Sequence, residues 1–258
     1  MYLLKFFRTF QRLFKFNSII KIIIGKRISK LSNSKVINGL YKNTYISSNS
    51  KWGKSDYANK LLGLYESQVQ KKIIQIKKKF NLIFFINFGA ADGYHIAGLL
   101  RNKIFKKGIA FEKDGRERKN LLNNFIKNKV KKRVDIFGEA DFNEVFKLLS
   151  KKDLKKTLFL IDIEGGEFEL FNNINIKNLK NSFFIIEIHE FFKVEKKLKK
   201  NFFNLIKKNF NIELIKNSER NPFNFEFLND LNDDERWLLM SEGRPSEMHW
   251  LFCFPKKA

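Results

Sequence analysis

Small residues and carboxylates stand at the ends of successive apolar runs in this sequence, where side chains can act on a bound ligand. The first run is followed by the stretch Asn87-Phe88-Gly89-Ala90-Ala91-Asp92-Gly93, whose small residues let backbone N–H groups approach a ligand closely. A helix that begins there favours the anionic end of a ligand. The stretch contains neither the G-x-G-x-x-G pattern of dinucleotide sites nor the Gly-Lys-Ser/Thr ending of a phosphate loop. It therefore predicts a ligand site of another class.

Acidic side chains follow the next four runs. Glu112 stands 23 residues after Gly89, close to the spacing at which a carboxylate meets the ribose hydroxyls of an adenosine. Residues 138–141, Gly-Glu-Ala-Asp, end the third run and could border an adenine ring. The fourth run ends in Asp-Ile-Glu-Gly-Gly-Glu, 162–167, and the fifth in Glu-Ile-His-Glu, 187–190. Helix N-termini also favour acids, but carboxylates that gather at one sheet edge predict a ligand, metal or catalytic role that compensates for their repulsion.

The elements that position these residues follow from the pattern after residue 81. Short apolar runs alternate with polar helical stretches, which is typical of βα units around a parallel sheet. Five parallel strands with right-handed crossovers give a doubly wound sheet, and the last two runs, separated by a segment containing Pro222 and Pro245, should pair as an antiparallel hairpin. We expect strands at 82–88, 108–112, 134–138, 157–163, 183–188, 212–215 and 249–254, and helices near 94–104, 116–128, 141–151, 166–173 and 191–209.

Ahead of this region the chain has the pattern of a helical extension. Residues 2–16 place Leu and Phe at helical spacing with basic residues mostly between them, which predicts an amphipathic basic helix. Such a helix could lie on an anionic membrane surface, or pack on the domain or on a partner subunit. Residues 32–55 are rich in Ser and Asn, which is typical of a linker, and 56–79 predict a second helical segment. We therefore divide the chain into an extension with its linker, 1–55, and a catalytic-sized domain, 56–258.

The composition narrows the class of protein. A chain of 258 residues with 43% hydrophobic residues and 30 phenylalanines can fold one α/β domain plus an appendage. The formal charge of +24 attracts polyanions, yet 41 of the 51 basic residues are Lys and only 10 are Arg, the residue that binds phosphates bidentately. The single cysteine, Cys253, excludes a disulfide framework, and we expect a cytoplasmic protein. No apolar run is long enough to span a membrane, and residues 1–30 lack the uninterrupted apolar stretch of a signal peptide.

Five stretches, in order and spacing, carry a family resemblance. INFGAADGY, AFEKD, FGEAD, LIDIEGGEFELF and IIEIHE resemble the motifs of class I S-adenosylmethionine-dependent methyltransferases, and the DIEGGE form is similar to the FkbM-type methyltransferases. The flanks KLLGLYESQV, 60–69, and SEGRPSEMHW, 241–250, also look like those of relatives of that group. The resemblance spans 56–256 and is strongest from 86 to 190. It implies a Rossmann-like, doubly wound seven-stranded sheet in the order 3-2-1-4-5-7-6, with the last strand antiparallel, and S-adenosylmethionine as methyl donor.

The resemblance also implies roles for single residues. Gly89, Ala91 and Gly93 would wrap the methionine part of the cofactor, and Asp162 would face the sulfonium and the acceptor. Two positions depart from the pattern, because Asn87 stands where an acidic residue is usual and Ala91 where the central glycine is usual. Asn87 can still accept a hydrogen bond from the cofactor's amino group. The full set implied for the cofactor is Asn87, Gly89, Ala90, Ala91, Asp92, Gly93, Glu112 at the ribose, Glu139 and Ala140 at the adenine, and Asp162.

The methyl transfer that the resemblance implies requires two things of the enzyme, alignment of the donor with the acceptor and removal of a proton. Methyl transfer from a sulfonium is an in-line displacement, so the enzyme aligns donor and acceptor and, for a hydroxyl acceptor, removes a proton. Asp162, Glu164 and His189 are the catalytic candidates, and His189 has the unperturbed pKa nearest neutrality. Alternatively, Asp162, Glu187 and His189 could hold a divalent cation that lowers the pKa of the hydroxyl. The resemblance implies O-methylation of a small molecule or saccharide, and we expect Asp162→Ala to abolish transfer without unfolding the chain.

Two other functions stay open. The net charge allows RNA or DNA methylation, although residues 162–165 stand where adenine amino-group methylases typically carry Asn/Asp-Pro-Pro-aromatic, and an acidic mouth repels phosphate. The chain could also be a non-catalytic Rossmann-like binding protein that docks on a membrane surface through residues 1–30. For the methyltransferase, the segment 217–248, between the last two strands, is placed to cover the acceptor pocket.

Overall fold

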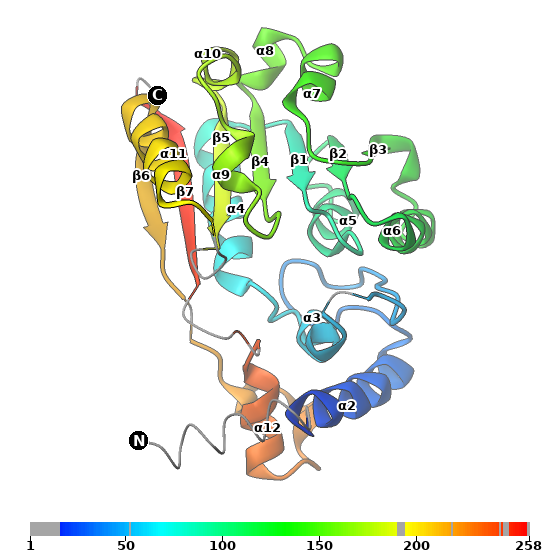
Figure 1. Ribbon diagram of the computed structural model, residues 1–258. Helices are drawn as coiled ribbons and strands as arrows, with labels where there is room; N and C mark the ends of the chain where they lie inside the picture. Colours follow the sequence, from blue (N-terminus) through cyan, green and yellow to red (C-terminus); the bar gives the residue numbers. More distant parts are fainter. Residues whose placement is uncertain are drawn as a thin grey trace, which may run out of the picture.

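A seven-stranded sheet in the order β3-β2-β1-β4-β5-β7-β6 organises the chain (Figure 1). The computed structural model describes residues 16–51, 53–189, 194–217, 219–242, 244 and 248–256. The pairs from β3 to β5 are parallel, and β7 is antiparallel to both of its neighbours, β5 and β6. This confirms the predicted strand order and the antiparallel last strand. The strands are β1 (Phe84–Phe88), β2 (Lys107–Phe111), β3 (Val134–Phe137), β4 (Thr157–Ile161), β5 (Phe183–Ile188), β6 (Phe210–Ile215) and β7 (His249–Pro255).

Successive strand residues point to opposite faces of the sheet and build two separate apolar cores. Phe85 and Leu158 belong to one core, whereas Ile86 and Phe159 belong to the other. Strands buried on both faces need helices on both faces. The first core is covered by α4 (Ser67–Phe80), α5 (Tyr94–Arg101) and α6 (Gly115–Lys127). The second is covered by α7 (Phe142–Leu148), α8 (Lys151–Leu154), α9 (Glu167–Leu170), α10 (Asn175–Leu179) and α11 (Lys196–Asn209).

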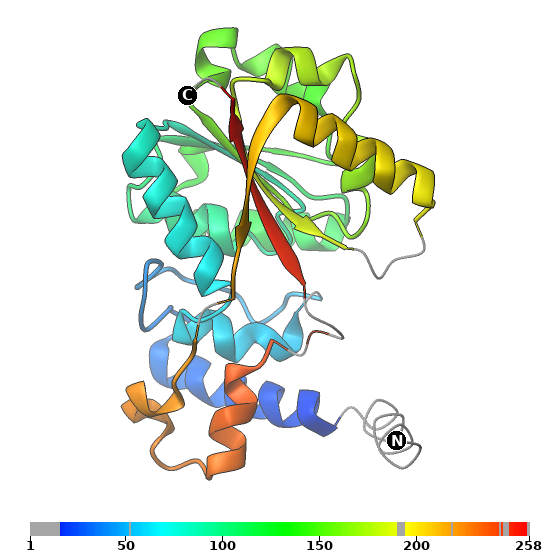
Figure 2. The same ribbon diagram turned by 90° about the vertical axis from the view of Figure 1, so that its left-hand side faces the viewer.

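A further layer lies beyond the carboxyl ends of the parallel strands (Figures 1 and 2). It is formed by α2 (Phe16–Ser32), α3 (Tyr57–Leu62) and α12 (Asp233–Met240), the last of which belongs to the insertion between β6 and β7. Lys21 Nζ of α2 and Asn59 Nδ2 of α3 both donate to the backbone oxygen of Ser241, at 2.6 and 2.9 Å. Segments from the two ends of the sequence therefore cover the same edge of the sheet.

The segment 32–55 differs from the expected linker. Val36, Tyr41 and Ile46 are fully buried in the first core. The side chains of Asn124 and Asn128 on α6 accept from the backbone N–H groups of Ser47 and Tyr45, at 3.0 and 2.8 Å. We call this segment the strap, because it packs on the domain. Its polar composition resembles that of a linker, but its polar groups form hydrogen bonds with residues far away in the sequence. Whether the chain divides into domains at residue 56 remains a prediction.

The helical segment expected over 56–79 is two helices, because Gly63 ends α3. Gly63 has a φ of 77°, and a Cβ there would lie 2.1 Å from the backbone oxygen of Asn38. Only glycine tolerates both the left-handed conformation and this approach. The chain therefore turns at Leu64–Glu66 before α4 begins, and this turn brings Tyr65 and Glu66 to the strand ends.

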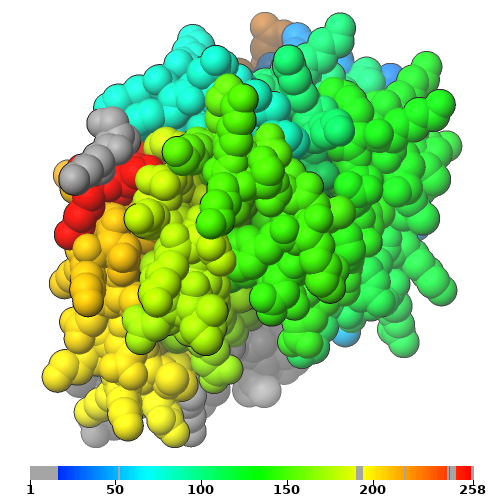
Figure 3. Space-filling view, turned by 90° about the horizontal axis from the view of Figure 1, so that it is seen from above, coloured from blue at the N-terminus to red at the C-terminus, as the bar shows by residue number. Residues whose placement is uncertain are grey.

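The other predicted helices are present with shifted bounds. The helix expected over 141–151 is divided into α7 and α8, and the one expected over 166–173 is shortened to α9, with α10 added after it. Seen from the end opposite to α2 and α12, α4 in cyan and α11 in yellow lie on either side of the β6 and β7 edge (Figure 3). The basic helix predicted over 2–16 lies almost entirely outside the described residues. Among the helices that the structure describes, none is both long enough and apolar enough to cross a membrane.

Candidate active site

The turn after β1 is shaped by close backbone contacts. Gly89 has a φ of 75°, and a Cβ there would lie 1.7 Å from the backbone oxygen of Asp162, so only glycine fits between β1 and the end of β4. The N–H groups of Gly89 and Ala90 both donate to the oxygen of Phe111, at 3.0 and 2.8 Å. Gly93, with a φ of 81°, begins α5. The turn is thus held where the strand order reverses between β1 and β4, which is where open α/β sheets bind ligands.

Glu112 and the turn are joined directly. One carboxylate oxygen of Glu112 accepts from the N–H of Ala91 at 2.7 Å, and the other accepts from the N–H of Asp114 at 2.8 Å. Burial raises the pKa of Glu112 above its usual range, although these two N–H groups oppose the shift. The loops after β1 and β2 therefore converge at one edge of the sheet, as their spacing in the sequence predicts.

A cavity of about 340 Å³, including its open mouth, lies at this edge. It brings together five of the residues expected at the cofactor, Asn87, Gly89, Ala90, Ala91 and Asp92, with Asp162 of the β4 end. Helix α3, the turn before α4, α5, β4 and β7 close the remaining walls with Lys60, Tyr65, Glu66, Tyr94, His95, Leu160 and Trp250.

Other expected cofactor residues lie outside this cavity. Gly93 and Glu112 stand behind the turn rather than on its wall. Glu139 is exposed and forms an ion pair at 2.7 Å with exposed Lys113, and Ala140 is half-buried against the second core. Of these residues Glu112 is buried, whereas Glu139 at the end of β3 lies on open surface.

Sequence reasoning missed the residues that close the cavity from the two flanks. Lys60, Tyr65 and Glu66 come from the KLLGLYESQV stretch, and Trp250 ends the SEGRPSEMHW stretch. Both stretches were part of the resemblance but carried no assigned role. Their residue types are common in helices and strands, so their position at the site became visible only through the fold.

A buried ion-pair network surrounds the cavity. Lys60 Nζ lies 2.7 Å from Asp92 Oδ2, and both side chains are buried. Glu66 contacts His95 Nε2 at 2.8 Å and Arg244 Nη2 at 3.0 Å. Arg244 also pairs with Glu187 at the end of β5 and with Glu242, which in turn pairs with Arg220. The insertion between β6 and β7 is therefore tied to the strand ends through Arg244. Its predicted place over an acceptor pocket stays a prediction.

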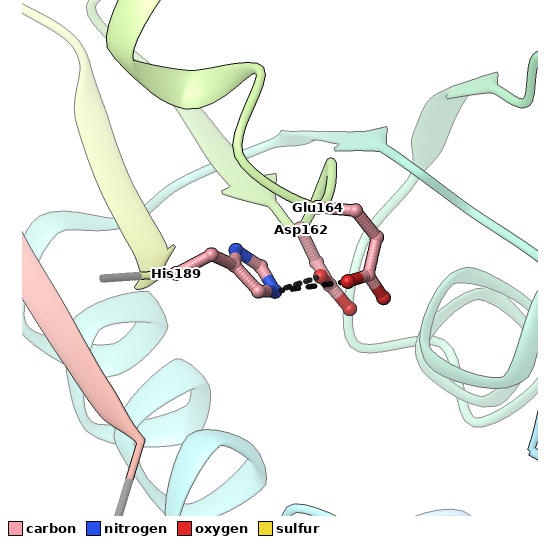
Figure 4. Close-up of side chains that lie close together, drawn as sticks. All are labelled: Asp162, Glu164 and His189. Atoms are coloured by element: carbon pink, nitrogen blue, oxygen red, sulfur yellow. Dashed lines mark ion pairs between the residues drawn. The ribbon is translucent and has the colours of Figure 1, made fainter. Parts of the chain in front are cut away.

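Asp162, Glu164 and His189, the three catalytic candidates, meet at one point beside the cavity (Figure 4). His189 Nε2 lies 3.4 Å from Asp162 Oδ1 and 3.6 Å from Glu164 Oε2. On the other side of the ring, Nδ1 lies 3.2 Å from the buried Glu167, which also accepts from the backbone N–H of His189 at 2.9 Å. Glu187 is close as well, at 3.5 Å from Nε2.

The carboxylates determine the charge of His189. Burial alone would lower its pKa, but Asp162 and Glu167 raise the pKa of His189 to about 10. This raised pKa favours the imidazolium at neutral pH, whereas the sequence led us to expect a base with a pKa near neutrality. Conversely, burial would raise the pKa of Asp162, yet the hydrogen bond and charge of His189 hold it below its usual range.

Glu164 differs from its neighbours by its exposure. Its side chain is 58% exposed, its φ is 54°, and burial of the rest together with the charge of Asp162 raises its pKa above the usual range. It is an accessible carboxylate whose pKa is shifted towards neutrality, which suits a proton acceptor.

Three ligand atoms for a cation also come together here. Those of Asp162, Glu164 and His189 lie within 4.8 Å of one another, as do those of Glu66, Asp162 and Glu187. Glu187, which we expected beside Asp162 and His189, lies 3.5 Å from His189 Nε2 and also pairs with Arg244.

Carboxylates outnumber cations around the cavity. The ion pairs join the seven carboxylates of Glu66, Asp92, Asp162, Glu164, Glu167, Glu187 and Glu242 to five basic residues, Lys60, His95, His189, Arg220 and Arg244. Even with Glu187 neutral, since burial raises its pKa well above the usual range, the site keeps an excess of negative charge in a chain whose formal charge is +24. Such a site favours a cationic ligand and repels phosphate.

The sheet order and the site at the strand switch define a doubly wound, Rossmann-like α/β fold. The chain is similar to the solved O-methyltransferase TomG from Streptomyces achromogenes, with 6% identity over 74% of this chain and 81% of that one, and a TM-score of 0.49. It is also similar to precorrin-6y C5,15-methyltransferase from Geobacter metallireducens GS-15, with 11% identity over 74% and 89% of the two chains and a TM-score of 0.45. A putative tRNA (m1A22) methyltransferase from Streptococcus pneumoniae gives 10% identity, 74% and 71% coverage and a TM-score of 0.44.

No protein-family model and no curated protein sequence matches the chain. At identities this low the likeness to solved structures describes the fold, so what the chain does has to be argued from its own residues.

Proposed function

We propose that the chain is an S-adenosylmethionine-dependent methyltransferase of the FkbM-like kind. The observation that supports this most directly is the cavity at the switch between β1 and β4, walled by the small-residue turn and by Asp162. The cofactor fits this donor set, because its methionine part carries two cationic groups and the cavity is rich in carboxylates. Asn87, Gly89, Ala90 and Ala91 would lie along the methionine part, and Glu112 beyond the turn would meet the ribose.

Bound S-adenosylmethionine supplies an electrophilic methyl group. The part of the chain is to hold the donor and to place an acceptor in line with it, with Asp162 beside the donor because its side chain lies on the cavity wall. The negative charge of the site favours an uncharged polar acceptor over a phosphate-rich one. We therefore propose the hydroxyl of a small molecule or saccharide as the group that is methylated.

Glu164 is the proposed proton acceptor for that hydroxyl. His189 is 1% exposed, with Glu167 on one ring nitrogen and three carboxylates around the other, so an acceptor cannot reach it without displacing them. Glu164 stands at the mouth of the same cluster with more than half of its side chain in solvent. His189 would then act as a positioning residue that holds Asp162 and Glu164 in place.

A divalent cation is a second candidate for activating the hydroxyl, favoured by the convergence of Asp162, Glu164 and His189. Those three residues would hold it, and Glu167 would orient the histidine as carboxylates commonly do at metal sites. The cation would lower the pKa of the acceptor hydroxyl. The two alternatives differ in a simple measurement: turnover that survives EDTA supports Glu164 alone, and turnover that is lost and then restored by Mg²⁺ or Mn²⁺ supports the cation.

Isothermal titration of the full chain with S-adenosylmethionine and S-adenosylhomocysteine tests the proposal, followed by a screen of saccharide and metabolite acceptors with labelled donor. We expect micromolar binding of both nucleosides and transfer to a hydroxyl. Absence of binding at millimolar concentration would overturn the methyltransferase assignment and favour the non-catalytic alternative.

We also propose that α2 rests on an anionic membrane surface. Its outer face carries Ile19 and Ile23, exposed by 49% and 61%, in the same stripe as the basic residues Lys26 and Lys30. Exposed isoleucines flanked by lysines are typical of interfacial helices. The neighbouring insertion adds the exposed rings of Phe223 and Trp237, whose centroids are 6.3 Å apart.

A further inference from the structure

Trp250 has a buried hydrogen-bond donor without a partner. The side chain is 1% exposed, and its indole Nε1 has no hydrogen-bond acceptor among the described residues. A buried N–H that no acceptor meets is costly, so native proteins rarely keep one without a purpose. Trp250 lines the cavity together with Asn87 and Asp162, so a ligand in the cavity is the candidate for the missing acceptor.

The position of Trp250 in the sheet keeps this donor in place. Trp250 lies on β7 between Glu187 of β5 and Ile215 of β6, with strands paired on both sides. Its ring is packed in the first core, so the indole cannot turn out to reach water. The indole is therefore held beside the cavity in advance of binding, which limits the ordering that a ligand must impose.

The chemistry of the indole decides which ligand group it can meet. An indole N–H donates and never accepts. Of the groups in the methionine part of the proposed donor, the ammonium offers only N–H donors and the sulfonium offers no acceptor, whereas the α-carboxylate offers two oxygen acceptors. The carboxylates of Glu66 and Asp162 on the same walls suit the ammonium in the same way.

The end of the cofactor that occupies the cavity follows from Glu112. This carboxylate, expected at the ribose, contacts the turn from outside the cavity through Ala91. With the ribose on that side of the turn, the enclosed volume beside Asn87 and Gly89 is left for the amino-acid end. The volume also holds the buried cation of Lys60, whose Nζ lies 2.7 Å from Asp92.

We propose that Trp250 is a cofactor-binding residue whose indole N–H donates to the α-carboxylate of the methionine part of the donor, so that the last strand of the sheet selects a nucleoside with an intact amino-acid end. This rests on the proposed function, and it assigns β7 a role in binding that no motif in the sequence indicates. Lys60, on the opposite flank of the cavity, would supply the charge that complements the same carboxylate.

Two nucleosides that differ only in the amino-acid end test the proposal. S-Adenosylhomocysteine carries the carboxylate and 5′-methylthioadenosine does not, so both are titrated into the full chain, into Trp250→Phe and into a control, Trp237→Phe, whose exposed ring lies on α12. Since hydrogen bonds to charged groups are the strong ones, we expect Trp250→Phe to bind S-adenosylhomocysteine about tenfold more weakly or worse. Methylthioadenosine should bind both variants as it binds the unaltered chain.

The other outcomes are distinguishable. Unchanged affinity of Trp250→Phe for S-adenosylhomocysteine would overturn the inference while leaving the methyltransferase proposal intact, as would an equal loss for both nucleosides. If neither nucleoside binds the unaltered chain, it is the proposed function that fails.

A second measurement does not depend on the variant folding. In the full chain labelled with ¹⁵N-tryptophan, the indole N–H resonance of Trp250 is assigned with the help of Trp52→Phe and Trp237→Phe. It should move downfield with S-adenosylhomocysteine and stay in place with methylthioadenosine. Equal movement with both nucleosides, or none with S-adenosylhomocysteine, would contradict the hydrogen bond.

Discussion

At the scale of single residues, the site shows which properties can be predicted from spacing and which cannot. Asp162 and His189 follow adjacent strands, β4 and β5, so their meeting was predictable from the sequence. The charge of His189 was not, because it depends on Glu167, a residue that looks like an ordinary first-turn acid in the sequence. No role for Trp250 was predicted, because its place on the cavity wall depends on the fold.

Replacing Asp162 by alanine should abolish methyl transfer without unfolding the chain. The side chain forms part of the cavity wall and pairs with His189, and its backbone oxygen, which fits against Gly89, is kept in the variant. Loss of a positioned catalytic group costs about 10²–10⁴-fold. Single-turnover transfer with labelled donor measures the loss, and circular dichroism checks the fold; unchanged turnover would remove Asp162 from the site.

Glu164→Gln should lower kcat by about 100-fold while leaving the affinity for S-adenosylhomocysteine nearly unchanged. Because the pKa of Glu164 is raised, transfer in the unaltered chain should increase as this carboxyl loses its proton with rising pH, and the variant should lack that rise. The measurement is the pH profile of kcat for the unaltered chain and for Glu164→Gln. A profile that is the same in both would assign proton removal elsewhere.

The stability of the fold should depend on the protonation of His189. Its pKa is raised from an ordinary value near 6.5 to about 10, so the stabilisation is fully present below pH 6.5 and disappears as the pH rises through about 10. We expect His189→Gln to be less stable than the unaltered chain near neutral pH and the difference to shrink towards pH 10. Urea unfolding across that range measures it; a constant difference would contradict the imidazolium.

At the scale of elements, buried strands were predicted within a few residues, because continuous apolar runs bounded by polar stretches leave little choice. Segments held in place by residues far away in the sequence were not predicted. The strap that contains Tyr41 looks like a linker until the side chains of Asn124 and Asn128 are seen to hold its backbone. The break between α3 and α4 had a sequence signal, Gly63, but the reason for it is the backbone of Asn38.

Gly89→Ala tests the most constrained turn. A Cβ would lie 1.7 Å from the oxygen of Asp162 at a φ of 75°, so we expect a loss of at least about 2 kcal/mol in the free energy of unfolding. Gly138→Ala is the matched control, since a Cβ there would meet only Arg118 Nη1 at 3.9 Å. Equal stability of the two variants in urea unfolding would show that the turn can relax.

At the scale of the whole molecule, charge is unevenly distributed. The chain carries +24 overall, yet its cavity keeps an excess of carboxylates, so composition alone pointed towards polyanions and away from the chemistry of the site. The positive charge is instead available to outer surfaces such as that of α2.

Anionic vesicles should therefore bind the chain through α2. We expect cosedimentation with phosphatidylglycerol vesicles, less with phosphatidylcholine, and roughly tenfold weaker binding for the double variant Ile19→Ser, Ile23→Ser. Ile126→Ser is the control, since Ile126 is exposed by 57% on α6, at a similar level to Ile23. Equal binding of the double variant and the control would exclude α2 as the contact.

The place of β7 between β5 and β6 has a consequence for how the protein is made. Both neighbours present an open edge until residues 249–255 have been synthesised, and open strand edges invite pairing with other chains. The nascent chain is therefore open to such pairing at this edge until β7 has been made. Trp250 lies on the same strand, so the residues that close the sheet also complete the wall of the cavity. A chain stalled before them would be prone to aggregation and would lack that wall.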